Sequence, residues 1–395
     1  MNPLSHFLSH TRLWIIPAGL IWITLLVLQN ELGYFRFQTV DAGYYQELAQ
    51  DFITGRQMVL DGLVNAKGNS FSPYPPGYPV LLGIFSWLEG SAGWLNHVLL
   101  HAAIGLFILM IWQQSLSLLP LAFVFFTDTV LSLAATGISE FSFTVFAILA
   151  VFSLTKLEQR GQWQWELGLT ASLCLCCWTR YAAVFFLVFM AFKLWRFFQI
   201  SPKKAAVLLW PCVYFSAFML VMFVSQWMET ELFTGGDRYP NSDSVGLLVK
   251  HLTIEIFNQL FFFRNIAGAS VYSIILGAFL SLGMIWLIIR EPFSENGPGF
   301  QAADENHSSF VELLSRNLIL AGFLYLAFMI PLRWYYYFAE PYDNRLLGPG
   351  FTLLLLGWVV SKEASIYRQP LLLKLFFLLT AIVFFLPDPL KLFDL

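Results

Sequence analysis

Charged residues are scarce in this chain: Asp, Glu, Lys and Arg together make up 12% of its 395 residues. Hydrophobic residues make up 58%, and the mean hydropathy is +0.66. A soluble domain of this composition would expose large apolar patches, so the composition indicates an integral membrane protein. The formal net charge of −3 lacks the basic excess that binding of nucleic acid requires, and membrane lipids are the expected surroundings instead.

Cysteine is also rare, and its four positions, Cys174, Cys176, Cys177 and Cys212, all lie inside apolar runs. No histidine or further thiol accompanies the Cys-x-Cys-Cys cluster. We therefore interpret these residues as packing side chains of a membrane helix rather than as metal ligands. No disulfide framework and no cofactor is predicted.

Long apolar runs dominate the rest of the chain and predict an all-α, polytopic bundle. A membrane helix needs roughly 17 to 25 apolar residues. Segments near this length predict about eleven membrane helices, at residues 13–29, 93–113, 117–134, 139–155, 166–179, 181–198, 205–227, 269–289, 318–332, 347–360 and 371–386. The first segment lacks a cleavage site and is read as a retained helix. The shorter run 80–88 predicts a surface or re-entrant helix.

The loops between these segments predict one membrane domain over residues 1–395, with no soluble domain after the last span. Lys and Arg in the shorter loops favour a cytoplasmic N-terminus. Long outer loops then fall at 30–92 and 228–268, and a shorter one at 333–347. Within the last of these, Arg333 beside three tyrosines reads as an interfacial anchor.

The first outer loop contains Asp41-Ala-Gly-Tyr-Tyr45, followed by apolar residues at Leu48, Ala49 and Phe52. This spacing predicts a short amphipathic helix that lies in the membrane interface, with Tyr44 and Tyr45 on its apolar face. Two roles are open for Asp41. It can cap the helix N-terminus, or it can act as a general base at the membrane surface.

A second motif in this loop is Tyr74-Pro-Pro-Gly-Tyr-Pro79. The prolines favour extended backbone and Gly77 permits a reversal, so the motif predicts a rigid turn. Tyr74 and Tyr78 carry aromatic rings with polar tips. They can serve as interfacial anchors or as rings that stack on a sugar.

Acidic and basic residues at later span ends complete the set of candidates. Ser139-Glu140 can be a helix cap with a favourable acid, or part of a site. Asp128 lies within a predicted span, where ionisable groups usually mark a site or a partner. Arg180, in Thr179-Arg180-Tyr181, and Arg345, in Asn344-Arg345-Leu346, suit phosphate recognition or snorkelling to lipid headgroups.

Taken together, these motifs resemble those of the GT-C membrane glycosyltransferases, in particular the bacterial branch related to protein O-mannosyltransferases and aminoarabinose transferases. The resemblance covers most of the chain in order and spacing. It implies transfer of a sugar from a polyprenyl phosphate donor to an acceptor hydroxyl on a lipid, glycan or protein. The transfer is usually inverting and occurs at the outer face of the membrane, here implied to be a bacterial inner membrane.

The resemblance also implies residue roles. Asp41 would be the catalytic base and Glu140 a second catalytic residue that positions the substrate or the base. Arg180 and Arg345 would neutralise the phosphate leaving group. The remaining implied substrate-binding residues are Tyr44, Tyr45, Tyr74, Tyr78, Tyr181 and Asn344. Asp41-Ala42 replaces the adjacent acids of some branches and no Asp-x-Asp motif occurs, so we expect transfer that needs no metal.

Two functions of other classes stay open at this stage. A transporter or flippase of a lipid-linked or amphipathic solute would show an internal repeat or paired broken helices, and the sequence shows neither. A non-catalytic scaffold of the same fold would retain the architecture without the chemistry.

Overall fold

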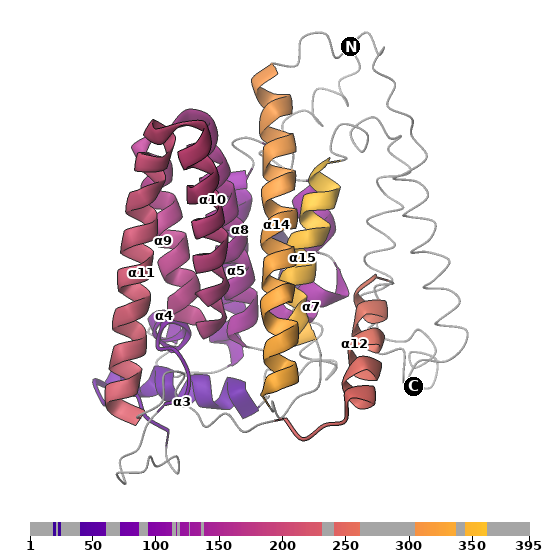
Figure 1. The fold of residues 1–395 in the computed structure, drawn as a ribbon. Helices are drawn as coiled ribbons and strands as arrows, with labels where there is room; N and C mark the ends of the chain where they lie inside the picture. The colour runs from indigo at the N-terminus through magenta and orange to yellow at the C-terminus, as the bar shows by residue number, and fades with distance from the viewer. Residues whose placement is uncertain are drawn as a thin grey trace, which may run out of the picture.

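The computed structural model describes residues 19–20, 23–24, 40–60, 72–86, 94–112, 116, 119–125, 127–135, 138–230, 241–260, 305–336 and 344–361. Within these residues the chain forms helices and no strand (Figure 1). Their bounds are α3 Val40–Thr54, α4 Gly77–Ser86, α5 Trp94–Trp112, α6 Leu119–Phe125, α7 Asp128–Ala135, α8 Ser139–Arg160, α9 Trp163–Thr179, η2 Tyr181–Val184, α10 Phe185–Ile200, α11 Pro202–Thr230, α12 Val245–Leu260, α14 Glu305–Tyr335 and α15 Asn344–Ser361.

Five helical segments in the described part of the chain are long and apolar enough to cross a membrane. They are Leu95–Trp112, Ser139–Arg160, Tyr181–Ile200, Pro202–Met228 and Ser309–Tyr335. Arg345–Ser361 is a shorter apolar helix. The prediction of a membrane helical bundle is therefore confirmed at this level. The predicted spans 269–289 and 371–386 lie outside the described residues, as does most of 13–29.

The predicted continuous span 117–134 is wrong, because α6 and α7 are separate helices with a bend at Thr127. The Thr127 hydroxyl donates to the Val124 carbonyl at 2.7 Å, and it accepts from the Val130 amide at 3.5 Å. A threonine that bonds the third amide of a helix is a standard N-cap. Asp128 is consequently the first residue of α7 and does not lie in the middle of a span.

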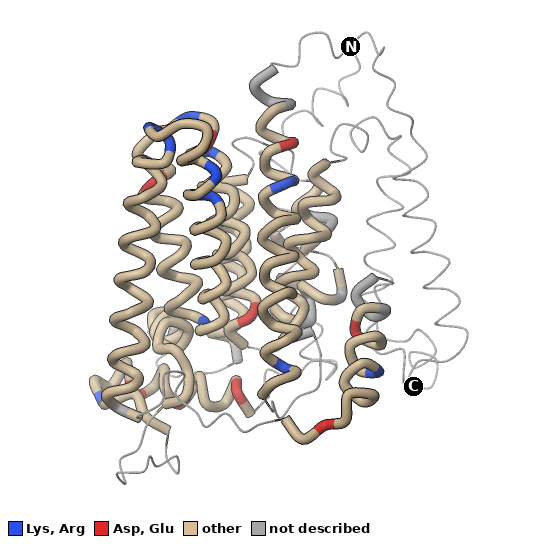
Figure 2. Tube along the Cα trace, in the orientation of Figure 1, with Lys and Arg blue, Asp and Glu red and all other residues tan. Residues whose placement is uncertain are grey.

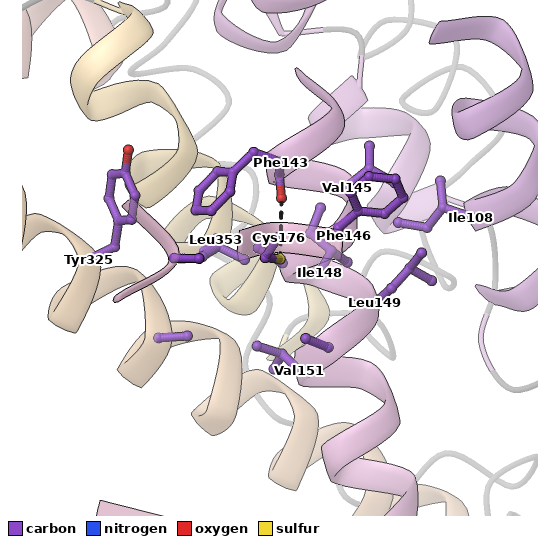
Figure 3. Packing of buried hydrophobic residues seen from close by; sticks show 14 of the residues in the cluster. Ile108, Phe143, Val145, Phe146, Ile148, Leu149, Val151, Cys176, Tyr325 and Leu353 are labelled. Atoms are coloured by element: carbon purple, nitrogen blue, oxygen red, sulfur yellow. Dashed lines mark hydrogen bonds between the residues drawn. The ribbon is translucent and has the colours of Figure 1, made fainter. Parts of the chain in front are cut away.

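Helix α8 forms the centre of the bundle, and its residues from Ser139 to Glu158 are buried. It packs against α5, α7, α9, α14 and α15. Aromatic rings fill the space around it: the Phe143 ring lies 5.8 Å from the Tyr325 ring of α14. Figure 3 shows this region, with Cys176 Sγ of α9 directed at the Phe143 carbonyl. Cys176 and Cys177 are free and buried, which is the packing role predicted for them.

Helices α14 and α15 run antiparallel in close contact. A Cβ atom on Gly322 would lie 2.8 Å from the Gly350 carbonyl oxygen, and one on Gly357 would lie 2.9 Å from that of Ser315. Small residues of this kind let membrane helices approach each other closely. The Ser315 hydroxyl adds a hydrogen bond to the Gly357 carbonyl at 2.7 Å. This pair fixes the position at which α15 begins, and hence the position of Arg345.

The first-loop helices α3 and α4 lie at one end of the bundle, where α3 runs across the ends of the long helices (Figure 1). The buried face of α3 comprises Ala42, Tyr45, Leu48 and Ala49. The amphipathic helix predicted here is present. Phe52, expected on its buried face, is 42% exposed.

Gly77 fixes how closely α4 approaches the end of α9. A Cβ atom at this position would overlap the backbone carbonyl of Trp178 and would lie 2.7 Å from Cγ of the same residue. We expect Gly77→Ala to lower the unfolding free energy by about 2 kcal/mol or more, because a backbone group cannot move aside as a side chain can. Thermal unfolding in detergent measures the effect.

Gly43 on α3 offers the matched control, since a Cβ atom there meets nothing within 4 Å. Gly43→Ala should raise stability by about 0.5–1 kcal/mol, because alanine favours the helix. Equal effects of the two substitutions would contradict the close approach of α4 to α9.

Candidate functional site

Two carboxylates and two arginines from four separate elements meet at the end of the bundle that carries α3 and α4. Asp41 lies in the first turn of α3, Glu140 in the first turn of α8 and Arg345 in the first turn of α15. Arg180 lies between α9 and η2, in extended backbone. These are four of the residues that the sequence singled out, and the structure brings all of them together.

Direct ion pairs join the four side chains. Arg180 Nη1 pairs with Glu140 Oε1, and Arg345 Nη2 pairs with Asp41 Oδ2. Arg345 Nε also contacts Glu140 Oε1 at 3.3 Å. Arg345 therefore bridges both carboxylates, and the formal charges of the four groups sum to zero.

The four side chains of this cluster differ in exposure to solvent. The Glu140 side chain is 2% exposed, whereas those of Asp41, Arg180 and Arg345 are 20%, 22% and 23% exposed. Glu140 Oε2 is buried and accepts no hydrogen bond from the described residues. Glu140 thus pairs with both arginines from the buried side of the cluster. Asp41, Arg180 and Arg345 are partly exposed and can contact a ligand.

The position of Arg345 is unfavourable for its own helix. The N-terminus of an α-helix carries partial positive charge and prefers an anion. Arg345 places a cation in the first turn of α15, and the two carboxylates offset that cost. Asp41 and Glu140 lie in the first turns of their helices, where an acid is favoured. The arginine therefore serves the cluster rather than the stability of α15.

The alternative in which Asp41 and Ser139 serve as helix caps receives no support from the geometry. Both Asp41 carboxylate oxygens accept from side chains, Oδ1 from Tyr74 and Oδ2 from Arg345. The N-cap of α8 is Ile138, which makes no side-chain cap bond. Ser139 is the next residue, and its hydroxyl shares a hydrogen bond of 3.1 Å with the Tyr45 hydroxyl.

Tyrosine side chains from the first loop lie beside the cluster. The Tyr74 hydroxyl donates to Asp41 Oδ1 at 2.8 Å, and its ring lies 4.9 Å from that of Tyr45 and 6.2 Å from that of Tyr44. Burial and the negative charge of Asp41 raise the pKa of Tyr74 above its usual value. The phenol therefore stays protonated at neutral pH and remains a donor to the carboxylate.

Tyr45 is more buried than Tyr74. It is 4% exposed, and burial together with the charge of Glu140 raises the pKa of its phenol. Tyr78 lies deeper still and is fully buried, so the structure leaves no face of its ring open for stacking on a sugar. Its hydroxyl instead contacts His97 Nδ1 at 2.9 Å and His101 Nε2 at 3.0 Å.

Two of the remaining candidates lie in different surroundings. The Tyr181 hydroxyl donates to Gln226 Oε1 of α11 at 2.9 Å, and its ring stacks on Phe223. Gln226 in turn donates to the Ser72 carbonyl at 2.9 Å, which fixes the backbone leading to Tyr74. Asn344 is the first residue of α15, and its side chain lies outside the described residues.

Arg333 is a correction to the sequence analysis. Its side chain is 3% exposed and pairs with Asp243 Oδ2 at 2.9 Å, so it is no interfacial anchor at the membrane surface. Asn241 fixes the same contact, with its side-chain amide donating to the Trp334 carbonyl at 3.2 Å and its backbone amide to Tyr335. The pair attaches the segment before α12 to the end of α14.

His97 and His101 were missed by the sequence analysis. Two histidines four residues apart in an apolar segment lie on one face of a helix, and this spacing was the available signal. In the part of the chain that the structure describes, no three His, Cys, Asp or Glu residues are grouped so that they could hold a metal ion.

The arrangement combines two chemical capacities. A partly exposed carboxylate can accept a proton from a hydroxyl group, and two partly exposed arginines can bind an anion such as phosphate. Comparison with known proteins adds no family assignment: no protein-family profile matches the chain, and no curated protein is significantly similar to it in sequence.

Proposed function

We propose that the protein is a membrane glycosyltransferase of the GT-C type, which moves a sugar from a polyprenyl phosphate to an acceptor hydroxyl. The observation that carries the proposal is the ion-paired cluster of Asp41, Glu140, Arg180 and Arg345 beside the tyrosines of the first loop. A lipid-linked donor keeps its tail in the bilayer, so its phosphate and sugar must react at the end of a helical bundle. The cluster lies at such an end.

The proposed reaction is a single displacement with inversion. Asp41 takes the proton of the acceptor hydroxyl as its oxygen forms a bond to the anomeric carbon. The bond between that carbon and the phosphate oxygen breaks, and the electron pair leaves with polyprenyl phosphate. Arg345 and Arg180 stabilise the charge that develops on this leaving group, where electrostatic help accelerates a reaction. No metal takes part in this scheme.

Charge distribution supports an outward-facing site. Seven Lys and Arg residues lie on the helix ends and halves opposite the site, namely Lys156, Arg160, Lys193, Arg196, Lys203, Lys204 and Arg316. Figure 2 shows basic positions concentrated toward that end of the bundle. Toward the site end the described basic residues are fewer: Arg180, Arg333 and Arg345 are each paired with a carboxylate, and Arg56 and Lys250 are exposed. At the opposite end, Lys193 is paired with Glu158. Positive charge favours the cytoplasmic side. We therefore propose that the site faces the periplasm, in a protein of a bacterial inner membrane.

The test uses purified protein in lipid nanodiscs with a panel of polyprenyl phosphate sugars and acceptors. We expect at least one donor to release polyprenyl phosphate in step with glycosylation of an acceptor. Arg345→Gln should lower this release roughly 10²- to 10³-fold, by analogy with loss of a group that stabilises transition-state charge. Arg196→Gln, at the opposite end of the bundle, is the matched control and should retain the wild-type rate.

Two outcomes would contradict the proposal. Movement of the intact donor across the bilayer of proteoliposomes, without release of polyprenyl phosphate, would establish a flippase. Absence of both release and movement with every donor would favour a non-catalytic scaffold.

A further inference from the structure

The phenol of Tyr78 lies between two histidines of α5 in the interior of the protein. Tyr78, His97 and His101 are all fully buried. The Tyr78 hydroxyl is 2.9 Å from His97 Nδ1 and 3.0 Å from His101 Nε2. The other nitrogen of His101, Nδ1, lies 2.6 Å from the backbone carbonyl of Ala134, at the end of α7. Four polar groups from α4, α5 and α7 thus form one chain.

The carbonyl at the end of this chain determines the direction of every hydrogen bond in it. A carbonyl only accepts, so His101 Nδ1 carries a hydrogen, and in a neutral imidazole Nε2 is then bare. Nε2 must accept from the Tyr78 hydroxyl, which has a single hydrogen to give. The Tyr78 oxygen can then only accept from His97, so His97 also carries its hydrogen on Nδ1.

We propose that His97 and His101 are positioning residues that hold Tyr78 at one depth and thereby set the place of Asp41 in the site. Ring contacts connect Tyr78 to Asp41. The Tyr78 ring packs edge-on against the Tyr45 ring at 4.8 Å, and Tyr45 lies 4.9 Å from Tyr74, which donates to Asp41 at 2.8 Å. The Tyr45 hydroxyl also bonds Ser139, the neighbour of Glu140.

Burying the polar side chains of Tyr78, His97 and His101 is costly, which indicates a role beyond filling space. Phenylalanine and leucine would fill the same volume without the desolvation penalty of three polar side chains. An apolar contact, however, tolerates sliding of α4 along α5, whereas a fully paired polar chain specifies one position. The overlap that any Cβ at Gly77 would make with Trp178 restrains the same helix against the end of α9. Helix α4 is therefore held by two neighbours, and its Tyr78 packs against Tyr45, the ring next to Tyr74, which donates to Asp41.

The tautomers provide a test that does not depend on the function. In protein labelled with ¹⁵N at histidine, the two buried histidines should both give the shifts of neutral imidazole with hydrogen on Nδ1. His97→Asn and His101→Gln assign the two sets of signals by removing one each. A hydrogen on Nε2 of either residue, or a doubly protonated ring, would overturn the chain as drawn.

The expected effect of these residues on catalysis rests on the proposed function, and the assay of donor turnover measures it. Tyr78→Phe keeps the ring but removes the hydroxyl, and we expect kcat to fall about 10- to 100-fold because a misplacement of about 1 Å can have that effect. KM for the donor should stay within about twofold, since both arginines remain in place. His101→Gln can still donate to Ala134 and accept from Tyr78, so it should retain most of kcat, whereas His101→Leu should not.

Thr155→Val is the control for a merely structural effect. The substitution removes a buried hydrogen bond of 3.0 Å that Asn317 of α14 donates to Thr155. Thr155 lies at the end of α8 that is far from Glu140. Thr155→Val should lower the unfolding temperature while leaving kcat unchanged. A wild-type kcat in Tyr78→Phe, or equal losses in His101→Gln and His101→Leu, would overturn the positioning role. If no donor is turned over at all, the proposed function fails while the tautomer result stands by itself.

Discussion

Replacing Asp41 with asparagine should lower turnover of the lipid-linked donor by roughly 10²- to 10⁴-fold, the range that a general base contributes. The substitution is isosteric, and the amide oxygen can still accept a hydrogen bond from Tyr74 or Arg345. It cannot take up the proton of an acceptor hydroxyl. The loss should therefore appear in kcat, with the KM for the donor changed little.

The measurement is release of polyprenyl phosphate by the protein in nanodiscs, at saturating donor and acceptor. Asp51→Asn on the same helix is the matched control, because Asp51 lies ten residues further along α3, away from the cluster. The control should retain the wild-type rate. Undiminished turnover in Asp41→Asn would remove this residue as the base, and an equal loss in both variants would point to damage to α3 as a whole.

The helices of the bundle could be predicted from the sequence because a lipid-facing or buried helix needs only a long apolar run. The predicted segments 93–113, 139–155, 181–198 and 205–227 each correspond to a helix, namely α5, α8, α10 and α11. The break between α6 and α7 could not be predicted in this way. A single threonine does not interrupt an apolar run, so the sequence pattern continues through Thr127. Its capping role depends on the direction of its hydroxyl group.

The candidate residues could be found from the sequence, but their partners could not. Arg345 contacts Asp41 across 304 positions of the chain and Glu140 across 205. No local pattern encodes contacts of that range, because they depend on α3, α8 and α15 all beginning at the same end of the bundle. The same reason explains Arg333: an arginine beside tyrosines at a helix end suits the interface, and only the fold reveals Asp243 beside it.

Tyr78 shows a different limit. Its motif predicts a rigid turn with two tyrosines, and the turn is present, with Tyr74 beside Asp41. Helix α4, however, begins at Gly77, and Tyr78 on it enters the core and meets His97 and His101, whereas Tyr74 lies before the helix. A motif of this kind predicts residue types and local geometry, but not which ring faces the site.

Replacing Glu140 with glutamine should have the largest effect on stability of any change in the cluster. Glu140 is buried and contacts both arginines, so the variant leaves Arg180 without its carboxylate partner. Breaking a buried ion pair from one side typically costs about 3–5 kcal/mol, because the remaining charge is no longer compensated. We expect a loss of that size in the unfolding free energy, measured by denaturant or thermal unfolding in detergent.

Glu166→Gln is the matched control, because Glu166 occupies the first turn of the neighbouring helix α9 but is only half-buried. It should change stability by no more than about 1 kcal/mol, the usual value of a surface charge at a helix end. Adding Arg180→Gln to Glu140→Gln should recover part of the loss, with an interaction energy of roughly 0.5–3 kcal/mol, because the second change removes the charge that the first left unpaired. Strictly additive losses in the double variant would show that the two side chains do not stabilise each other, and Glu140 would then not be the group that holds the arginines in place.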